Sequence, residues 1–171
     1  MKKLALAASC MIILTVGCTN SETQKNIAQH KEEQHHHNEK PSFFQGDLRE
    51  ETASVEVLPS FLKDKPEDMQ LIYSAAAQHK EVLEYIPCYC GCGTSAGHKS
   101  SYNCFVYENK EDGSLTWDDH GTRCGVCLEI AATSVMEYSK GKSVEEIRHL
   151  IDEAYKEGYS TPTPTPEPKN G

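Results

Sequence analysis

The stretch Ile86-Pro87-Cys88-Tyr89-Cys90-Gly91-Cys92-Gly93 places three cysteines within five residues. A second dense pair, Cys124-Gly125-Val126-Cys127, lies downstream, where an apolar helical period begins. Pro87 disfavours helical backbone at the residue before it, so the first cluster should leave the end of a helix as a tight loop. The second pair should open the next long helix. We therefore expect the two cysteine clusters to meet in space.

The apolar pattern around these clusters predicts a small, mainly α domain over residues 46–158. The first of its three helices should follow Asp64 and end near Tyr85. The second should run from about Arg123 to Ser139, and the third should lie between Ser143 and Gly158. Ser143 and Glu146 form a capping box at the start of the third helix. Between the first two helices we expect either a long Cys/His-rich loop or a short β-hairpin that turns at Asp112-Gly113. Residues 54–58 should form a short strand or an extended segment.

The cysteines and nearby histidines predict a metal site. Thiolates are soft ligands, and a C-x-x-C pair at a helix N-terminus points both sulfurs at one place, where the helix dipole lowers the thiol pKa. Such a set favours copper(I) or zinc, with an iron–sulfur cluster as a further option. The candidate ligands are Cys88, Cys90, Cys92, His98, Cys104, His120, Cys124 and Cys127.

Two other interpretations of the cysteines stay open. Six cysteines in a small exported domain can form a disulfide framework that staples a structural or interaction module of the cell envelope. Alternatively, Cys124 and Cys127 can form a thiol–disulfide redox pair, although no strand of a thioredoxin-like unit precedes them. The disulfide interpretation does not explain why three cysteines lie within five residues.

The N-terminus predicts export and membrane anchoring. Lys2 and Lys3 precede a short apolar run, residues 4–16, that is typical of a secretory signal. Thr15-Val16-Gly17-Cys18 resembles a bacterial lipobox, which implies a signal peptide over residues 1–17 and acylation of Cys18. We therefore expect a lipoprotein held at the cell membrane and facing the extracytoplasmic side, with ordinary secretion as the alternative.

Polar segments flank the predicted domain. Residues 18–45 should form a disordered tether, in which His30, His35, His36 and His37 either collect metal or occur by chance in a polar linker. Residues 159–171 should form a disordered Pro/Thr tail. The net charge of −9 argues against nucleic-acid binding. No residue pattern of a hydrolase or kinase is present, so we expect no catalysis, and the sequence identifies no protein partner.

The sequence also resembles known families. Ile86–Gly93, Gly97-His98, Asn103-Cys104-Phe105-Val106, Trp117-x-x-His120-Gly121 and the Cys124–Ala131 segment resemble bacterial lipoproteins named for their PCYCGC motif, whose function is largely unknown. The resemblance implies anchoring and architecture over about residues 47–155, but no activity. Gly121–Cys127 is also similar to half of the [2Fe-2S] motif of bacterioferritin-associated ferredoxin. There the intervening segment is helical and here it is not, so we disfavour a [2Fe-2S] cluster.

Overall fold

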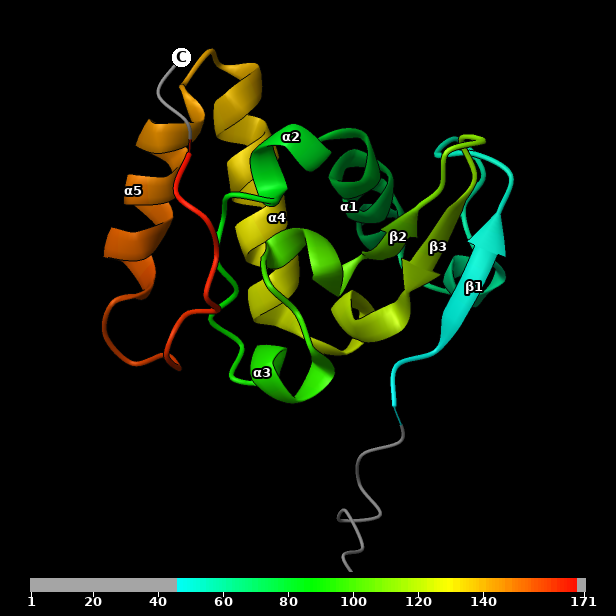
Figure 1. Ribbon diagram of the computed structural model, residues 1–171, viewed down its shortest axis with the longest axis horizontal. Coiled ribbons are helices and arrows are strands. Elements are labelled where there is room, and N and C mark those ends of the chain that lie inside the picture. The colour runs from blue at the N-terminus through cyan, green and yellow to red at the C-terminus, as the bar shows by residue number, and fades with distance from the viewer. Residues whose placement is uncertain (1–45, 169–171) are drawn as a thin grey trace, which may run out of the picture. The chain divides into compact units, whose positions relative to one another are not determined.

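The computed structural model describes residues 46–168, in which three helices of twelve or more residues accompany a three-stranded antiparallel sheet (Figure 1). The signal segment, Cys18, the tether and its four histidines lie outside the described residues, as do residues 169–171. The helices are α1 (Glu67–Gln78), α2 (Lys80–Leu83), α3 (Gly93–Ala96), α4 (Gly125–Ser139) and α5 (Val144–Tyr155). The strands are β1 (Arg49–Thr52), β2 (Val106–Asn109) and β3 (Leu115–Asp118), and short 3-10 helices span Ser60–Leu62, Ser101–Cys104 and Asp119–Arg123.

The sheet corrects the expectation of a mainly α domain, because the fold is mixed and roughly half helical. The hairpin β2–β3 forms where it was predicted and turns at Gly113, whose φ is 87°. The unexpected strand is β1, which pairs with the other edge of β3 and opposes Glu50 to Trp117. Its sequence, Arg-Glu-Glu-Thr, is polar, so no apolar alternation marks it. Residues 54–58, the segment expected to be extended, belong to no strand.

The first predicted helix is interrupted at His79. There the backbone leaves the helical region (φ −120°, ψ 46°), and the short helix α2 follows. Nδ1 of His79 lies 2.8 Å from the carbonyl oxygen of Ala75, a side-chain contact that competes with regular helix bonding. Neither glycine nor proline marks this break in the sequence. The capping box of Ser143 and Glu146 forms as predicted.

The core gathers around α4, which stands between α1 and α5 (Figure 1). Tyr73, Phe105 and Trp117 are fully buried in this core, with Tyr73 and Phe105 in an edge-to-face contact at 4.9 Å. Ile130 and Ile151 are buried on α4 and α5. Among the described helices, none is long and apolar enough to cross a membrane. Packing around α4 thus fixes the position of the N-terminus of this helix, where the second cysteine pair lies.

The C-terminal tail differs from the predicted disordered segment over its described residues, 159–168. It is extended and runs between α5 and the loop that follows α2 (red in Figure 1). Its backbone hydrogen-bonds to that loop, from Ser160 N to Tyr89 O and from Thr163 N to Cys88 O. Alternating threonine and proline is typical of an unpaired polyproline-like segment, so these contacts could not be predicted from the residue pattern.

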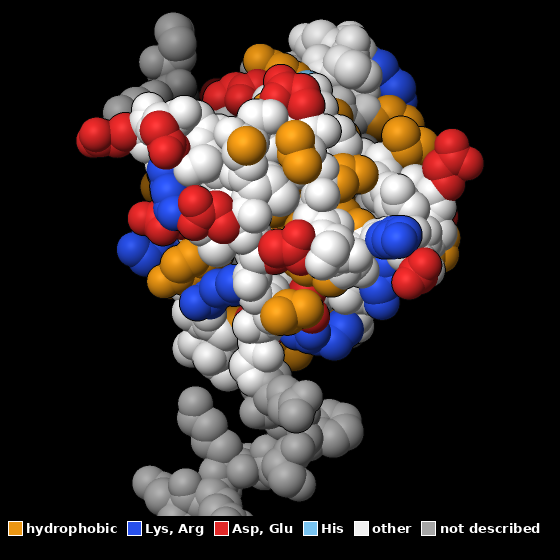
Figure 2. Space-filling model, turned by 90° about the vertical axis from the view of Figure 1, so that its right-hand side faces the viewer, with side chains coloured by type: hydrophobic (Ala, Val, Ile, Leu, Met, Phe, Trp, Pro, Cys, Tyr) orange, Lys and Arg blue, Asp and Glu red, His pale blue; other side chains and the backbone are white. Residues whose placement is uncertain are grey.

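The described surface carries charges of both signs. On the face that β1 covers, acidic, basic and hydrophobic side chains are interspersed (Figure 2). Arg49 lies over the ring of Tyr107, 3.5 Å from its centroid, and Nε of Arg49 donates to Asp118 at 3.1 Å. These contacts hold the edge strand β1 to the hairpin, and they bring the residues just before β1 close to the 3-10 helix that contains His120.

Candidate metal centre

All eight predicted ligands lie in one connected group at the N-terminus of α4. Cys88 and Cys90 come from the loop after α2, Cys92 is the N-cap of α3, and His98 lies two residues beyond the end of α3. Cys104 ends the 3-10 helix Ser101–Cys104, His120 lies in the 3-10 helix Asp119–Arg123, Cys124 is the N-cap of α4 and Cys127 is in its first turn. The structure therefore brings together the two cysteine clusters and the histidines between them.

The innermost part of the group consists of Cys88, Cys104 and Cys127. Their exposed fractions are 1%, 0% and 0%. The Sγ atom of Cys88 lies 3.6 Å from that of Cys127 and 3.5 Å from that of Cys104. A disulfide requires about 2.05 Å, so these are contacts between thiols. The six cysteines among the described residues are free.

The outer part of the group is partly exposed. Cys90, Cys92 and Cys124 are half-buried, and the first of these faces His120, with Sγ 3.7 Å from Nε2. The backbone N–H of Cys92 donates to Sγ of Cys90 at 3.3 Å. A thiolate that accepts such hydrogen bonds is stabilised in its charged form. These three are the more exposed cysteines of the group.

Two buried imidazoles connect the inner and outer parts. The rings of His98 and His120 lie 4.6 Å apart at 76°. Nδ1 of His98 is 3.6 Å from Sγ of Cys104. Among residues 46–168 its Nε2 has no hydrogen-bond partner, and the nearest carboxylate oxygen there, on Asp47, is 3.9 Å away. A buried polar atom without a hydrogen-bond partner costs free energy, so this nitrogen indicates a position for a further ligand or a proton.

Asp47 is the most important neighbour that the sequence reasoning missed. Its Oδ1 lies 3.1 Å from Nδ1 of His120 and also bonds to Arg123. This contact leaves Nε2 of His120 facing the sulfur of Cys90. Such a carboxylate behind a histidine is the usual support of a metal ligand. Asp47 lies 73 residues before His120, so no local spacing could reveal it.

Asp118 and Asp119 bond to the backbone around His120. Asp118 accepts a hydrogen bond from the backbone N–H of His120 at 3.0 Å, as the N-cap of the 3-10 helix. Asp119 accepts from the backbone N–H of Leu48 at 2.7 Å and pairs with Arg123. Together they fix the backbone on either side of the site.

Protonation is unevenly distributed over the metal-free group. Hydrogen bonds from Cys124, Cys127 and His120 lower the pKa of Cys90 to about 4. Burial and the negative charge of Cys90 raise the pKa of Cys92. Cys127, which donates to the surrounding sulfurs, has a raised pKa. Burial works against charge on His120, but its bonds to Cys90 and Asp47 prevail and raise its pKa to about 9. The pair of Cys90 and His120 is therefore thiolate and imidazolium near neutral pH.

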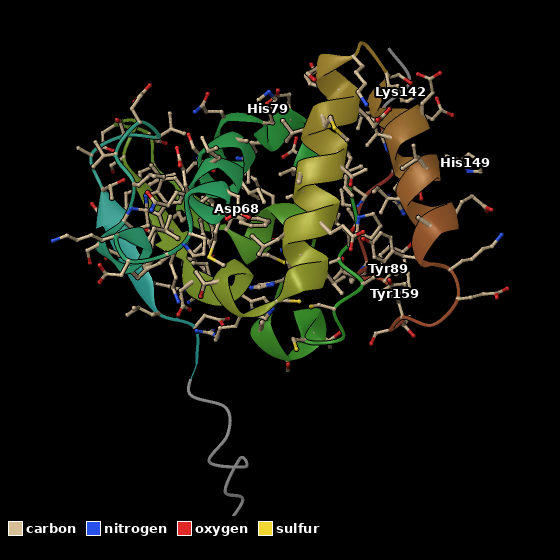
Figure 3. The ribbon with its side chains drawn as sticks, turned by 180° about the vertical axis from the view of Figure 1, so that it is seen from behind. Asp68, His79, Tyr89, Lys142, His149 and Tyr159 are labelled. Carbon is tan, nitrogen blue, oxygen red and sulfur yellow. The ribbon has the colours of Figure 1, made fainter. Side chains whose placement is uncertain are left out.

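The loop that carries the first cysteines is held from behind by α5 and the tail. The hydroxyl of Tyr89 donates to Asp152 at 2.7 Å, and its ring stacks on Tyr155 at 5.5 Å. Figure 3 shows Tyr89 and Tyr159 close together at the end of α5. The backbone N–H of Cys88 donates to Oγ1 of buried Thr163 at 2.9 Å.

The glycines of the motif make room for this tail. A Cβ atom on Gly93 would lie 2.5 Å from Cγ2 of Thr163, and one on Gly91 would clash with Oγ of Ser160. Gly91 also has a φ of 81°, which a residue with a side chain rarely adopts. Both glycines are therefore needed for the loop to lie against the tail with its sulfurs facing α4.

The donor groups can hold metal in several overlapping ways. Four sets of three Cys or His ligand atoms lie within 4.8 Å of one another. They are Cys88, Cys104 and Cys127; Cys90, Cys92 and His120; Cys90, Cys124 and Cys127; and His98, Cys104 and His120. A fifth set, Asp47, His98 and Asp118, lies beside them. The sulfur and imidazole donors suit a soft metal ion.

These features define a small mixed α/β domain with a buried Cys/His group that could hold a metal ion. The family model described as protein of unknown function with PCYCGC motif matches residues 7–168. The chain belongs to this family, which confirms the resemblance seen in the sequence. No curated protein matches the chain, and no solved structure does either.

The uneven protonation predicts which thiol reacts first. In the metal-free, reduced chain at pH 6, Cys90 should be alkylated by iodoacetamide well before Cys92, although both are half-buried, because a thiol with a pKa of about 4 is already a thiolate. The rate at Cys90 should fall only when the pH drops toward 4. Peptide mapping after timed quenching measures both rates, and preferential labelling of Cys92 would show that the charge distribution is wrong.

The tail contact predicts a stability change. Thr163→Ala removes the acceptor of the buried Cys88 N–H and should lower the free energy of unfolding by about 1–3 kcal/mol. Thr161→Ala, at an exposed position of the same tail, is the matched control and should change it by less than about 0.5 kcal/mol. Urea denaturation under reducing, metal-free conditions compares the two. Equal stabilities would mean that the tail does not hold the loop.

Proposed function

We propose that this chain is a lipid-anchored lipoprotein of the extracytoplasmic face of the cell membrane that binds a soft metal ion, copper(I) first and zinc second, for storage, sensing or hand-over. The observation that supports it best is the convergence of six free thiols and two imidazoles, from segments far apart in the chain, into sets within 4.8 Å. We expect a binding protein and no catalysis.

The distances between the sulfur atoms support a bound metal ion better than a disulfide bond. With a zinc–sulfur bond of about 2.3 Å, two thiolates on one tetrahedral ion lie about 3.8 Å apart. The inner sulfurs already lie at 3.5 and 3.6 Å, within a few tenths of an ångström of that spacing. Binding would require little movement of the chain, only loss of the thiol protons to solvent.

Hand-over is supported by the difference between the inner and outer parts of the group. Cys90, Cys92 and Cys124 are half-buried, so a partner's ligand can reach them, whereas Cys88, Cys104 and Cys127 are closed off. Copper(I) accepts two or three soft ligands and moves between thiolates by ligand exchange. Zinc prefers four ligands, which suits a structural or storage role.

Anchoring in this proposal depends on residues outside the described part of the chain. The signal segment 1–17 and Cys18 would attach the domain to the membrane through acyl chains, and residues 18–45 would separate it from the surface. The histidines at 30 and 35–37 would collect metal near the domain. The polar and charged composition of residues 18–45 suits a tether of this kind.

The alternatives have less support. A disulfide-stapled envelope module would need bridges, and among residues 46–168 the cysteines are free. A redox pair at Cys124 and Cys127 lacks the preceding parallel strand, because a 3-10 helix and an antiparallel hairpin come before α4. A [2Fe-2S] cluster remains disfavoured, since the segment between the cysteine pairs contains this hairpin.

Metal content and thiol state test the proposal together. The full chain, purified in detergent under anaerobic and reducing conditions, should carry at least one copper or zinc ion per molecule. Its cysteines should resist alkylation until a chelator removes the metal, because ligated thiolates are poor nucleophiles. Mass spectrometry that finds three disulfides and no metal would instead establish the stapled module.

A substitution that removes one negative charge and keeps the shape of the side chain sharpens this test. Asp47→Asn should weaken metal affinity by roughly 10–100-fold, because the carboxylate behind His120 supports its ligating nitrogen. Asp68→Asn is the matched control, since Asp68 is an exposed residue of α1 (Figure 3) whose carboxylate, within residues 46–168, accepts a hydrogen bond from Met69 N. Equal metal affinities of the two variants would show that Asp47 does not support His120 as a ligand.

A further inference from the structure

We infer that the group is a two-ion centre, with a buried inner ion and an accessible outer ion that share the sulfur of Cys127. This rests on the proposed function and goes beyond it, since a soft-metal protein needs only one ion. The inner ion would take Cys88, Cys104 and Cys127, with His98 completing the set. The outer ion would take Cys90, Cys124 and Cys127, with Cys92 or His120, which both lie within 4.8 Å of Cys90, as the fourth ligand.

The number of donors exceeds what one soft ion can use. One zinc ion takes about four protein ligands, and copper(I) takes fewer. Eight Cys and His donors gather in the four overlapping sets, so a single ion would leave at least half of them unligated. Two ions that share Cys127 and take four ligands each would use seven of the eight donors.

Burial divides the donors into an inner and an outer group. The inner sulfurs are 0–1% exposed, and each of them lies against the apolar core that includes Ile86 and Ile130. The outer cysteines are all half-buried and belong to the ends of α3 and α4 and the loop between α2 and α3. An ion in the inner group could leave only if the chain opened locally, whereas one in the outer group faces solvent.

Cys127 is the link between the two groups. It belongs both to the inner set with Cys88 and to the set with Cys90 and Cys124. A thiolate has the lone pairs to bridge two soft ions. An ion can thus enter at the outer cysteines and pass inward by ligand exchange. A bond to Cys90 breaks as one to Cys88 forms, while the bond to Cys127 is kept. The oxidation state does not change, and each thiol that binds gives its proton to solvent.

Zinc(II) is the clearest probe, because its preference for four ligands makes the count easy to interpret. The full reduced chain in which His30, His35, His36 and His37 are replaced by alanine, so that the tether adds no ions, should saturate at two zinc ions in native mass spectrometry. An added chelator should remove one ion quickly and the second at least roughly ten-fold more slowly, because the inner sulfurs are reached only by local opening.

Two matched substitutions assign the phases. Cys88→Ser should leave one ion that is released quickly, and Cys92→Ser should keep the slow ion and weaken the fast one, since a serine hydroxyl is a poor ligand for soft metals. His149→Ala, at an exposed position on α5, is the control and should keep two ions and both phases.

The outcomes separate this inference from the proposed function. Saturation at one ion, with a single release phase, overturns the two-ion centre and leaves the metal-binding function standing. No bound zinc and no bound copper(I) overturns both. Circular dichroism shows whether each cysteine variant folds. If one does not, the ion count and the release phases of the chain that keeps every cysteine still test the two-ion centre, because both require two sites of unequal access.

Discussion

The contact between Cys88 and Cys127 is the interaction on which the rest of the structure depends. These sulfurs, 39 residues apart in sequence, lie 3.6 Å from each other inside the core. To bring them together the chain must end α2 at the PCYCGC loop, turn through α3 and the hairpin, and return to the start of α4. Sulfur ligands held in this way can bind a metal that cross-links the domain, and structural zinc in small domains contributes on the order of 10 kcal/mol to folding. A metal would therefore act as part of the core as well as cargo.

Both ends of the described chain close around this contact. Asp47, before β1, supports His120, and Thr163, after α5, holds the backbone of Cys88. Residues at the two ends thus control the two sides of the site.

Much of the arrangement could be predicted, because local signals encode it. The capping box at Ser143, the turn at Gly113 and the helix start after Cys124 are each determined by a few neighbouring residues. What was missed depends on long-range pairing. The polar strand β1 gains its partners only from β3, and Thr163 is buried only because Gly91 and Gly93 leave space for the tail. The eight candidate ligands could be identified from residue type and spacing, whereas Asp47 could not, since its role comes from tertiary proximity alone.

The most direct test of the central claim is X-ray absorption spectroscopy of the metal-loaded chain at the copper or zinc edge. The account predicts a first shell dominated by sulfur, with zinc–sulfur distances of about 2.3 Å or slightly shorter copper(I) distances, and a smaller imidazole contribution. A shell of oxygen and nitrogen alone, at about 2.0–2.2 Å, would contradict it, because the metal would then be bound by groups other than the cysteines.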